Sequence, residues 1–130
     1  MEIKARAQGF AKCIVGSGEH WVQCDQPSSN GGDNSAMTPT ELLGAALAAC
    51  GLYYAAQYLK TRGLNAEGLE VHLHGEKASG PTRIGRFRLE VRIRELEERH
   101  REALLRAVKT CVVHNTLTHA PEIEVAYASA

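Results

Sequence analysis

The sequence lacks the features that mark several classes of protein. Its 15 Lys and Arg residues are balanced by 15 Asp and Glu residues, so no net charge favours nucleic acid or an anionic membrane. No apolar run reaches the roughly 18 to 20 residues of a membrane span. The opening stretch MEIKARAQGF has no apolar segment of the kind found in a secretory signal. We therefore expect a cytoplasmic protein with no nucleic-acid or membrane partner.

The cysteines form no C-x-x-C pair, which is the spacing that a four-cysteine zinc site uses. Cys111 and His114 have a C-x-x-H spacing, but a zinc site needs two or three further ligands, such as Cys13, Cys24 or His119. No second close pair supplies them, so we predict no metal site. A framework of structural disulfides is not expected in a reducing compartment either. Burial or thiol chemistry remains for the cysteines.

Alternation of polar and apolar residues predicts six strands. They are expected at residues 2–8, 12–16, 20–24, 69–76, 86–94 and 121–128. The second and third are predicted to form a hairpin, as are the fourth and fifth, and the last is expected to close a sheet. Residues 25–37 are polar and rich in Gly and Ser, which predicts a loop. With two helices, this order predicts a single α+β domain over residues 1–130, with helices packed against antiparallel sheet.

The first helix is predicted to follow the polar loop directly. Thr38 suits the N-cap, Pro39 the first helical position, and Glu41 completes a capping box. Apolar residues then surround the helix on nearly every side, which predicts a central, buried helix that ends at Gly63. A second helix is expected at about residues 97–111.

A row of arginines occupies the polar face of the predicted strand 86–94. It has two interpretations, a stripe that binds nucleic acid or a solvated face paired with Glu70, Glu76 and the histidines of the neighbouring strand. No aromatic residues interleave with the arginines for base stacking. We therefore favour the solvated face, in which each cross-strand pair contributes a few tenths of a kcal/mol.

Glu41 also has two interpretations. It is a candidate substrate-binding group that orients or polarises a substrate near Cys50, further along the same helix. The local pattern equally makes it only the second half of the capping box, a contribution of about 1 kcal/mol.

Cys50 and Cys111 are both expected on helices of the core. Cys50 lies between Ala49 and Gly51, whose small side chains leave space against the sulfur. Packed helices lie roughly 8 to 10 Å apart, close enough to bring two sulfurs together. A thiolate that attacks a peroxide becomes a sulfenic acid, and a second thiol condenses with it to a disulfide without a metal or organic cofactor. The alternative is that both cysteines only fill the core.

These residues resemble the OsmC/Ohr family of peroxide-detoxifying proteins, in the form of its less characterised OsmC-like branch. Both cysteine motifs occur in the same order and at a similar separation, and the resemblance covers nearly the whole chain, most weakly residues 1–37. The matching segments are TPTELLGAALAAC (residues 38–50), GLNAEGLEVHLHGE (63–76), RFRLEVRI (86–93) and KTCVVHNTLTHAPEIEV (109–125).

The resemblance implies an OsmC-like fold in which antiparallel sheets wrap around two central helices in an intertwined homodimer. It implies a thiol-dependent peroxidase that reduces organic hydroperoxides, with Cys50 as the attacking and Cys111 as the resolving cysteine. An external dithiol, such as a lipoylated protein, is expected to reduce the disulfide again. The alternative within the same fold is a non-enzymatic protein that senses redox state or binds a small ligand.

The sequence departs from the peroxidase branches of the family at the group that activates the thiol. Those branches carry an arginine in the loop before the central helix, and a glutamate directly after the proline holds it. Here no arginine lies between Arg6 and Arg62, and Thr40 follows Pro39, with Glu41 one place later. Arg6, or a basic group of the second subunit, is the candidate replacement.

Overall fold

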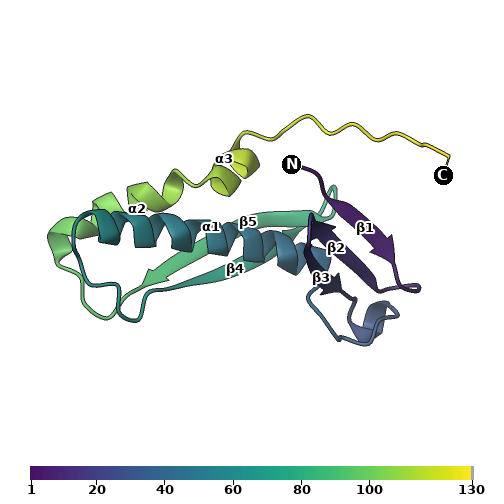
Figure 1. Cartoon of the computed structure of the whole chain (residues 1–130), viewed down its shortest axis with the longest axis horizontal. Helices are drawn as coiled ribbons and strands as arrows, with labels where there is room; N and C mark the ends of the chain where they lie inside the picture. Colours follow the sequence, from purple (N-terminus) through teal and green to yellow (C-terminus); the bar gives the residue numbers. More distant parts are fainter. Residues whose placement is uncertain (130) are drawn as a thin grey trace. The chain divides into compact units, whose positions relative to one another are not determined.

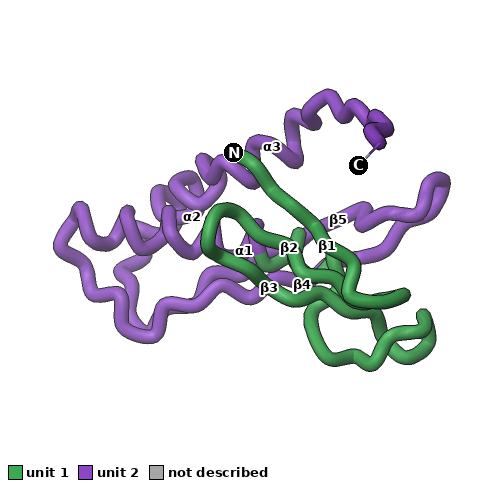
Figure 2. The backbone as a smooth tube through the Cα atoms, turned by 45° about the vertical axis from the view of Figure 1, so that its right-hand side comes forward, with its two compact units in different colours: residues 1–45 green, residues 46–130 purple. Residues whose placement is uncertain are grey.

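The computed structural model describes residues 1–129 and divides into two compact units, Met1–Ala45 and Ala46–Ala130 (Figure 2). The strands and helices along the chain are labelled in Figure 1. The strands are β1 (Lys4–Ala7), β2 (Cys13–Ser17), β3 (His20–Cys24), β4 (Glu70–Ala78) and β5 (Arg83–Arg92). The helices are α1 (Pro39–Thr61), α2 (Arg101–Lys109) and α3 (Val112–Thr118), with short 3-10 turns η1 (Ser28–Asn30) and η2 (Glu98–His100).

The first unit contains an antiparallel sheet in the order β1-β2-β3. Strands β2 and β3 form the predicted hairpin, with Val15 opposite Val22 and Cys13 opposite Cys24. Gly18 takes a left-handed backbone conformation in the turn, with φ of 59°. Glycine adopts this conformation without the steric cost that a side chain brings, which explains the glycine at position 18.

The loop at residues 25–37 is built around the buried carboxylate of Asp25. This carboxylate accepts hydrogen bonds from the backbone N–H groups of Gln26, Asp33 and Ser35 at 2.8, 3.1 and 2.9 Å. The Ser35 hydroxyl donates a fourth at 2.6 Å. These bonds, that of the Ser35 hydroxyl foremost, hold the pKa of the Asp25 carboxyl well below its usual range. The sequence showed a loop but did not identify its organising residue.

Helix α1 begins at the predicted capping box. The backbone N–H of Glu41 donates to the Thr38 hydroxyl oxygen at 3.1 Å, and the Thr38 hydroxyl donates to the Glu41 carboxylate at 3.2 Å. The helix ends at Thr61, and Gly63 follows with φ of 64°, as the C-terminal glycine predicts. Both predicted ends of the helix are confirmed.

Helix α1 is long and apolar enough, by length and composition, to cross a membrane. An 18-residue stretch of it has a mean hydropathy of 1.3, which corrects the expectation that no segment would reach this threshold. The central helix of a globular domain meets the same criterion. Here Ala55, Tyr58 and Leu59 are buried in the core of the second unit.

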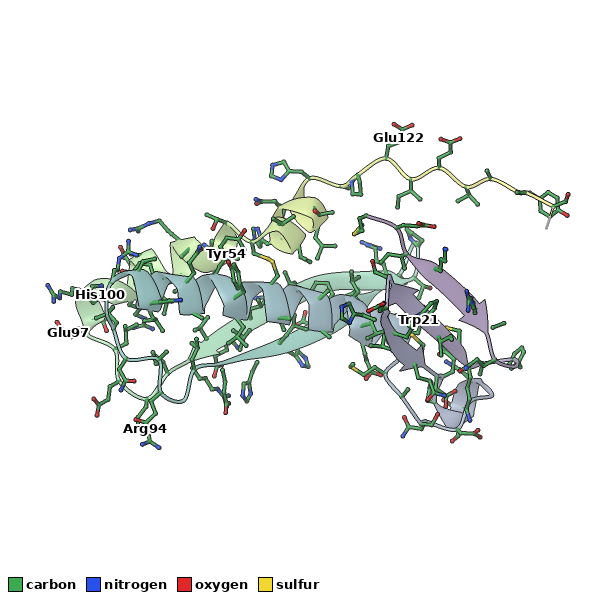
Figure 3. The ribbon with its side chains drawn as sticks, viewed as in Figure 1. Trp21, Tyr54, Arg94, Glu97, His100 and Glu122 are labelled. Carbon is green, nitrogen blue, oxygen red and sulfur yellow. A yellow bond between two sulfur atoms is a disulfide. The ribbon has the colours of Figure 1, made fainter. Side chains whose placement is uncertain are left out.

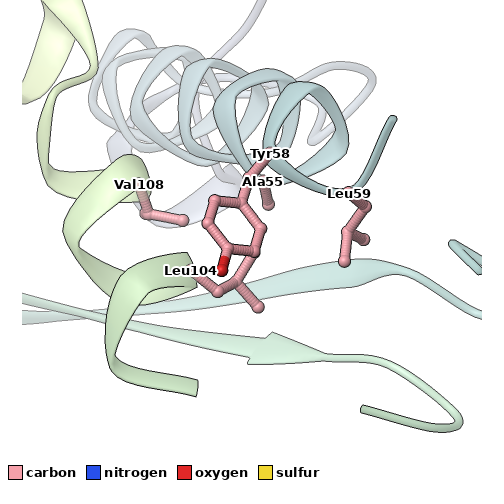
Figure 4. Packing of buried hydrophobic residues seen from close by; sticks show 5 residues of the cluster. All are labelled: Ala55, Tyr58, Leu59, Leu104 and Val108. Atoms are coloured by element: carbon pink, nitrogen blue, oxygen red, sulfur yellow. The ribbon is translucent and has the colours of Figure 1, made fainter. Parts of the chain in front are cut away.

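The second unit packs α1 and α2 onto the hairpin of β4 and β5. Its core consists of buried residues from both helices, and the inward face of β5 covers them (Figure 4). These residues are Ala55, Tyr58, Leu59, Leu104 and Val108. The strands are paired along their length, with Leu73 opposite Leu89 and one register shift after Glu76.

The arginine row lies on the exposed face of β5, as predicted, and Glu70 and Glu76 stand opposite Arg92 and Arg86. The ion pairs, however, do not follow this register. Arg92 binds Glu90 of its own strand at 2.6 Å, and this contact lowers the pKa of the Glu90 carboxyl. Such exposed pairs add little stability.

The helix predicted at about residues 97–111 forms as η2 followed by α2, but it ends before Thr110 and Cys111. The helix α2 ends at Lys109, and the hydroxyl of Thr110 donates to the carbonyl of Ala107 at 2.6 Å. Cys111 has an extended backbone, with ψ of 133°, and acts as the N-cap of α3. The described chain thus has a third, short helix in addition to the two that were predicted.

The predicted closing strand at residues 121–128 does not form a strand in the part of the chain that the structure describes. The segment is extended after α3 (Figure 1). Its apolar residues are exposed: Ile123 at 81%, Val125 at 90% and Tyr127 at 92%. The alternating pattern is that of a strand, but a strand needs a neighbouring edge with which to pair its backbone groups.

Candidate thiol site

Cys50 of α1 and Cys111 form a disulfide, marked by the yellow bond in Figure 3. Their Cα atoms are 5.8 Å apart, within the usual range for a bridged pair. The structure therefore brings together the two cysteines that were predicted to react with each other. They are 61 residues apart in the sequence, and the link joins the central helix to the start of α3.

The two sulfur-bearing residues differ in exposure. Cys50 is half-buried, whereas Cys111 has no exposed surface. A reagent that arrives from solvent therefore meets Cys50 first. The order in which Cys50 attacks and Cys111 resolves stays a prediction, and the greater exposure of Cys50 favours it.

Gly51, which was predicted to leave space against the sulfur of Cys50, has a different role in the structure. A Cβ atom on Gly51 would lie 3.3 Å from a methyl group of Leu89 and 3.3 Å from one of Val108. Gly51 therefore lets β5 and α2 approach the central helix closely. The space at this glycine is filled by core packing and does not open onto the sulfur.

A cavity of about 310 Å³ is lined by residues one helical turn away from each cysteine, and neither cysteine lines it. Leu47, one helical turn before Cys50, and His114, in the first turn after Cys111, both line it. Most of the lining is apolar, with Arg86, His114 and Thr118 as the polar residues. The other residues are Ile84, Gly85, Phe87, Leu89 and Leu117. Such a cavity suits a small molecule that has an apolar body.

The backbone N–H and the side-chain Nδ1 of His114 are both relevant to the thiol site. Its backbone N–H donates a hydrogen bond to the sulfur of Cys111 at 3.4 Å. Its side-chain Nδ1 is buried and has no hydrogen-bond partner among the described residues. A donor on the sulfur favours the thiolate form of Cys111 when the disulfide is reduced.

Arg86 is the cationic residue that sequence reasoning assigned only to the solvated face. It lies on β5 beside Gly85, where the register shift after Glu76 leaves the glycine without a partner on β4. Such a bulge changes the direction of neighbouring side chains and is common near functional sites. The Gly85-Arg86 sequence within an otherwise regular strand was the available signal.

The other predicted site residues have local contacts of their own. The guanidinium of Arg6 lies 5.0 Å from the centre of the Trp21 ring, a cation–π contact within the first unit. Glu41 is exposed and bonded to Thr38 in the capping box. The role of Arg6 in activating Cys50 and that of Glu41 in binding substrate stay predictions.

Cys13 and Cys24 belong to the first unit, where they face each other across β2 and β3 as free thiols. Burial, together with a hydrogen bond to Cys13, raises the pKa of the Cys24 thiol. Within residues 1–129 the structure contains no cluster of three or more His, Cys, Asp or Glu residues that would hold a metal ion.

Comparison with known proteins gives a consistent result at the level of family and fold. Residues 32–126 match the sequence profile of the family described as OsmC-like protein. No curated protein matches the chain. Solved structures match it over most of its length, each at low sequence identity.

Three of these structures illustrate the range. An osmotic stress induced and detoxification response protein from Psychrobacter arcticus has a TM-score of 0.80 at 21% identity, over 88% of this chain and 85% of its own. An organic hydroperoxide resistance protein from Legionella pneumophila has a TM-score of 0.63 at 21% identity, over 89% and 87%. OhrB of Bacillus subtilis, also named for organic hydroperoxide resistance, has a TM-score of 0.65 at 18% identity, over 92% and 90%. These likenesses show the fold.

Proposed function

We propose, since the chain belongs to the OsmC-like protein family, that it is a thiol-dependent peroxidase that reduces organic hydroperoxides. The observation that carries this proposal is the disulfide between Cys50 and Cys111 beside a largely apolar cavity. Two relatives in fold are named for organic hydroperoxide resistance, which supports the choice of substrate class.

The reaction has two oxidative steps. The thiolate of Cys50 attacks the terminal oxygen of the hydroperoxide, the O–O bond breaks, and the alcohol leaves after it takes a proton. Cys50 is then a sulfenic acid. The sulfur of Cys111 attacks the sulfur of Cys50, the S–O bond breaks, and water leaves as the disulfide forms.

Reduction of the disulfide requires an external dithiol, for which a lipoylated protein is the proposed class. Because Cys50 is the more exposed partner, the incoming thiolate attacks its sulfur and Cys111 leaves. The hydrogen bond from the His114 backbone to Cys111 stabilises that leaving thiolate. The second thiol of the dithiol then releases Cys50, and the dithiol becomes a disulfide. We place this cycle in the cytoplasm, where such reductants are available.

We also propose that the protein acts as a homodimer. Helix α1 is apolar on nearly every side, yet Leu52 and Tyr53 are exposed at 36% and 61% in the single chain. Val112 of α3 is exposed at 64%, and the extended segment after α3 presents further apolar residues. A second copy is the partner whose surface would cover these residues.

The cavity itself favours one alternative function, a non-enzymatic member of the fold that senses redox state or retains a small apolar ligand. This alternative predicts that the thiols oxidise once, slowly, and without turnover. Mass spectrometry of the native protein separates the two functions. A molecule retained in the cavity, together with absence of turnover, would favour the binding protein.

The direct test compares peroxide consumption by the parent protein and by Cys50→Ser, with cumene hydroperoxide and a dithiol reductant. We expect the substitution to lower the rate at least a hundredfold, because it removes the nucleophile. Cys13→Ser is the matched control, since that thiol lies in the first unit, and it should leave the rate within about twofold. Equal consumption by Cys50→Ser and the parent would contradict the proposal.

A further inference from the structure

We propose that His114 is the proton acceptor for Cys111 when that thiol attacks the oxidised Cys50. This inference rests on the proposed function, because it assigns a residue to the resolving step. It gives a purpose to the C-x-x-H spacing, for which no metal site was found within residues 1–129.

The first observation is the position of His114 relative to the reacting sulfur. Cys111 is the N-cap of α3, and His114 is the residue whose backbone N–H donates to its sulfur, at 3.4 Å. Cys111 and His114 therefore share one turn of chain. The histidine also lines the largely apolar cavity.

The second observation is that a ring nitrogen of His114 has no hydrogen-bond partner in the described part of the chain. Nearly all buried polar atoms in proteins have a hydrogen-bond partner, and an exception calls for a reason such as catalysis. Nδ1 of His114 is the single buried side-chain nitrogen or oxygen without a partner in the described part of the chain. An imidazole nitrogen that no other group occupies is free to take a proton.

The third observation is that Cys111 has no exposed surface. Its thiol must lose a proton to become the attacking thiolate, and bulk water does not reach it. We assign this proton to an internal acceptor. Arg86 of β5 is the charged residue among those that line the cavity. Helix α1 contributes only Leu47, which is apolar and lies one helical turn before Cys50. Among these lining residues, His114 is the one whose side chain has a ring nitrogen able to take up a proton.

The step balances without a further reagent. Nδ1 takes the proton of the Cys111 thiol, and the thiolate attacks the sulfur of the Cys50 sulfenic acid. The S–S bond forms as the S–O bond breaks. The departing hydroxide takes the proton back from the imidazole and leaves as water, so His114 ends the step as it began.

The test measures the attack by Cys111 without any peroxide. Reduced protein is mixed with dithiobis(nitrobenzoate), which attaches to Cys50 and releases one coloured thiolate. Cys111 then attacks the mixed disulfide and releases a second coloured thiolate. The rate of this second release is followed by stopped flow. The contribution of Cys13 and Cys24 is measured in the Cys50→Ser/Cys111→Ser protein and subtracted. Because the released group leaves as a thiolate, only the loss of the Cys111 proton is tested.

His114→Asn keeps a polar group near the position of Nδ1 but takes up no proton at neutral pH. We expect it to slow the second release at least tenfold at pH 7, with a rate that rises by about tenfold per pH unit up to pH 9. Over the same range the parent rate should rise less steeply. His119→Asn, an exposed histidine at the end of the same helix, is the control and should match the parent. Circular dichroism checks the fold, and His114→Gln replaces the asparagine variant if that one unfolds.

A second release that is as fast in His114→Asn as in the parent, with the same pH profile, would overturn the inference. So would a parent protein that shows no second release. Failure of the proposed function has a separate signature. In that case the second release still depends on His114, but the parent does not turn over cumene hydroperoxide.

Discussion

The sulfur of Cys111 has two structural roles, as the cap of a helix and as half of a disulfide. It caps α3 by accepting a hydrogen bond from the backbone N–H of His114, and it is bonded to Cys50 of α1. If Cys111 is the resolving cysteine, its replacement by serine should stop the cycle after one oxidation. We expect Cys111→Ser to consume one equivalent of hydroperoxide and to accumulate a sulfenic acid at Cys50, which dimedone labelling and mass spectrometry detect. Undiminished turnover in this variant would show that another thiol resolves.

Asp25 gives a pH-dependent prediction for the first unit. The pKa of the Asp25 carboxyl lies below the ordinary 3.8 because four donors stabilise the carboxylate. The carboxylate therefore stabilises the folded protein above about pH 5, and this contribution is lost as the pH falls. Asp25→Asn should lower Tm at pH 7 by about 5 °C or more, and the difference from the parent should shrink below pH 4.

The control for this measurement is Asp33→Asn. Asp33 forms an ion pair with Lys12 at 2.6 Å, but its side chain is 73% exposed, so its loss should change Tm by less than about 2 °C. A difference between Asp25→Asn and the parent that stays constant from pH 7 to pH 3 would contradict the assignment.

The residues of the thiol site were predictable to different degrees. Cys50 and Cys111 were found from their motifs, because each motif is local in the sequence. Arg86 was noted only as part of the arginine row, and His114 only for its C-x-x-H spacing with Cys111. Their place at the cavity was not predicted, because it depends on a strand bulge and a helix start that no periodicity shows. Asp25 was missed for the same reason, since its four donors come from a loop without a repeating pattern.

At the scale of elements, Gly51 determines how closely α1 approaches its neighbours. A larger side chain there would meet Leu89 and Val108, both of which belong to or border the core. We expect Gly51→Leu to lower the free energy of unfolding by about 3 kcal/mol, as overpacking does in a tight core. Gln57→Leu, an exposed position on the same helix, should stay within about 0.5 kcal/mol of the parent in urea unfolding. Equal effects of the two substitutions would show that Gly51 is not a close-packing position.

The elements that the sequence predicted correctly are those with a local signal. The capping box and terminal glycine set the ends of α1, and alternation set the strands of both hairpins. The break after Lys109 had no such signal, because residues 103–111 keep a helical apolar pattern up to Cys111. The covalent link and the sulfur's role as an N-cap override that pattern, and both depend on the tertiary structure.

At the scale of the whole molecule, the unpaired segment at residues 121–128 is explained if it pairs with a second chain. Dimerisation would cover the exposed apolar side chains of this segment. Light scattering should then give twice the chain mass of 14.1 kDa. Val125→Lys places a charge among the apolar residues and should shift the protein toward the monomer.

Glu124→Lys is the matched control for this prediction, because it adds the same lysine on the alternate, polar side of the segment. It should leave the mass unchanged. A parent protein that has the monomer mass at all concentrations would contradict the dimer and leave the closing strand as a plain error of prediction. No single-chain pattern distinguishes a strand that pairs within its own chain from one that pairs with another.

The central claim is that Cys50 and Cys111 exchange electrons with a hydroperoxide as one pair. The most direct measurement is the mass of the fully reduced protein after one equivalent of cumene hydroperoxide, followed by peptide mapping. The account predicts the loss of two hydrogen atoms and a single linked peptide that contains Cys50 and Cys111. Recovery of both residues as free thiols, or as separately oxidised acids with no link between them, would contradict it.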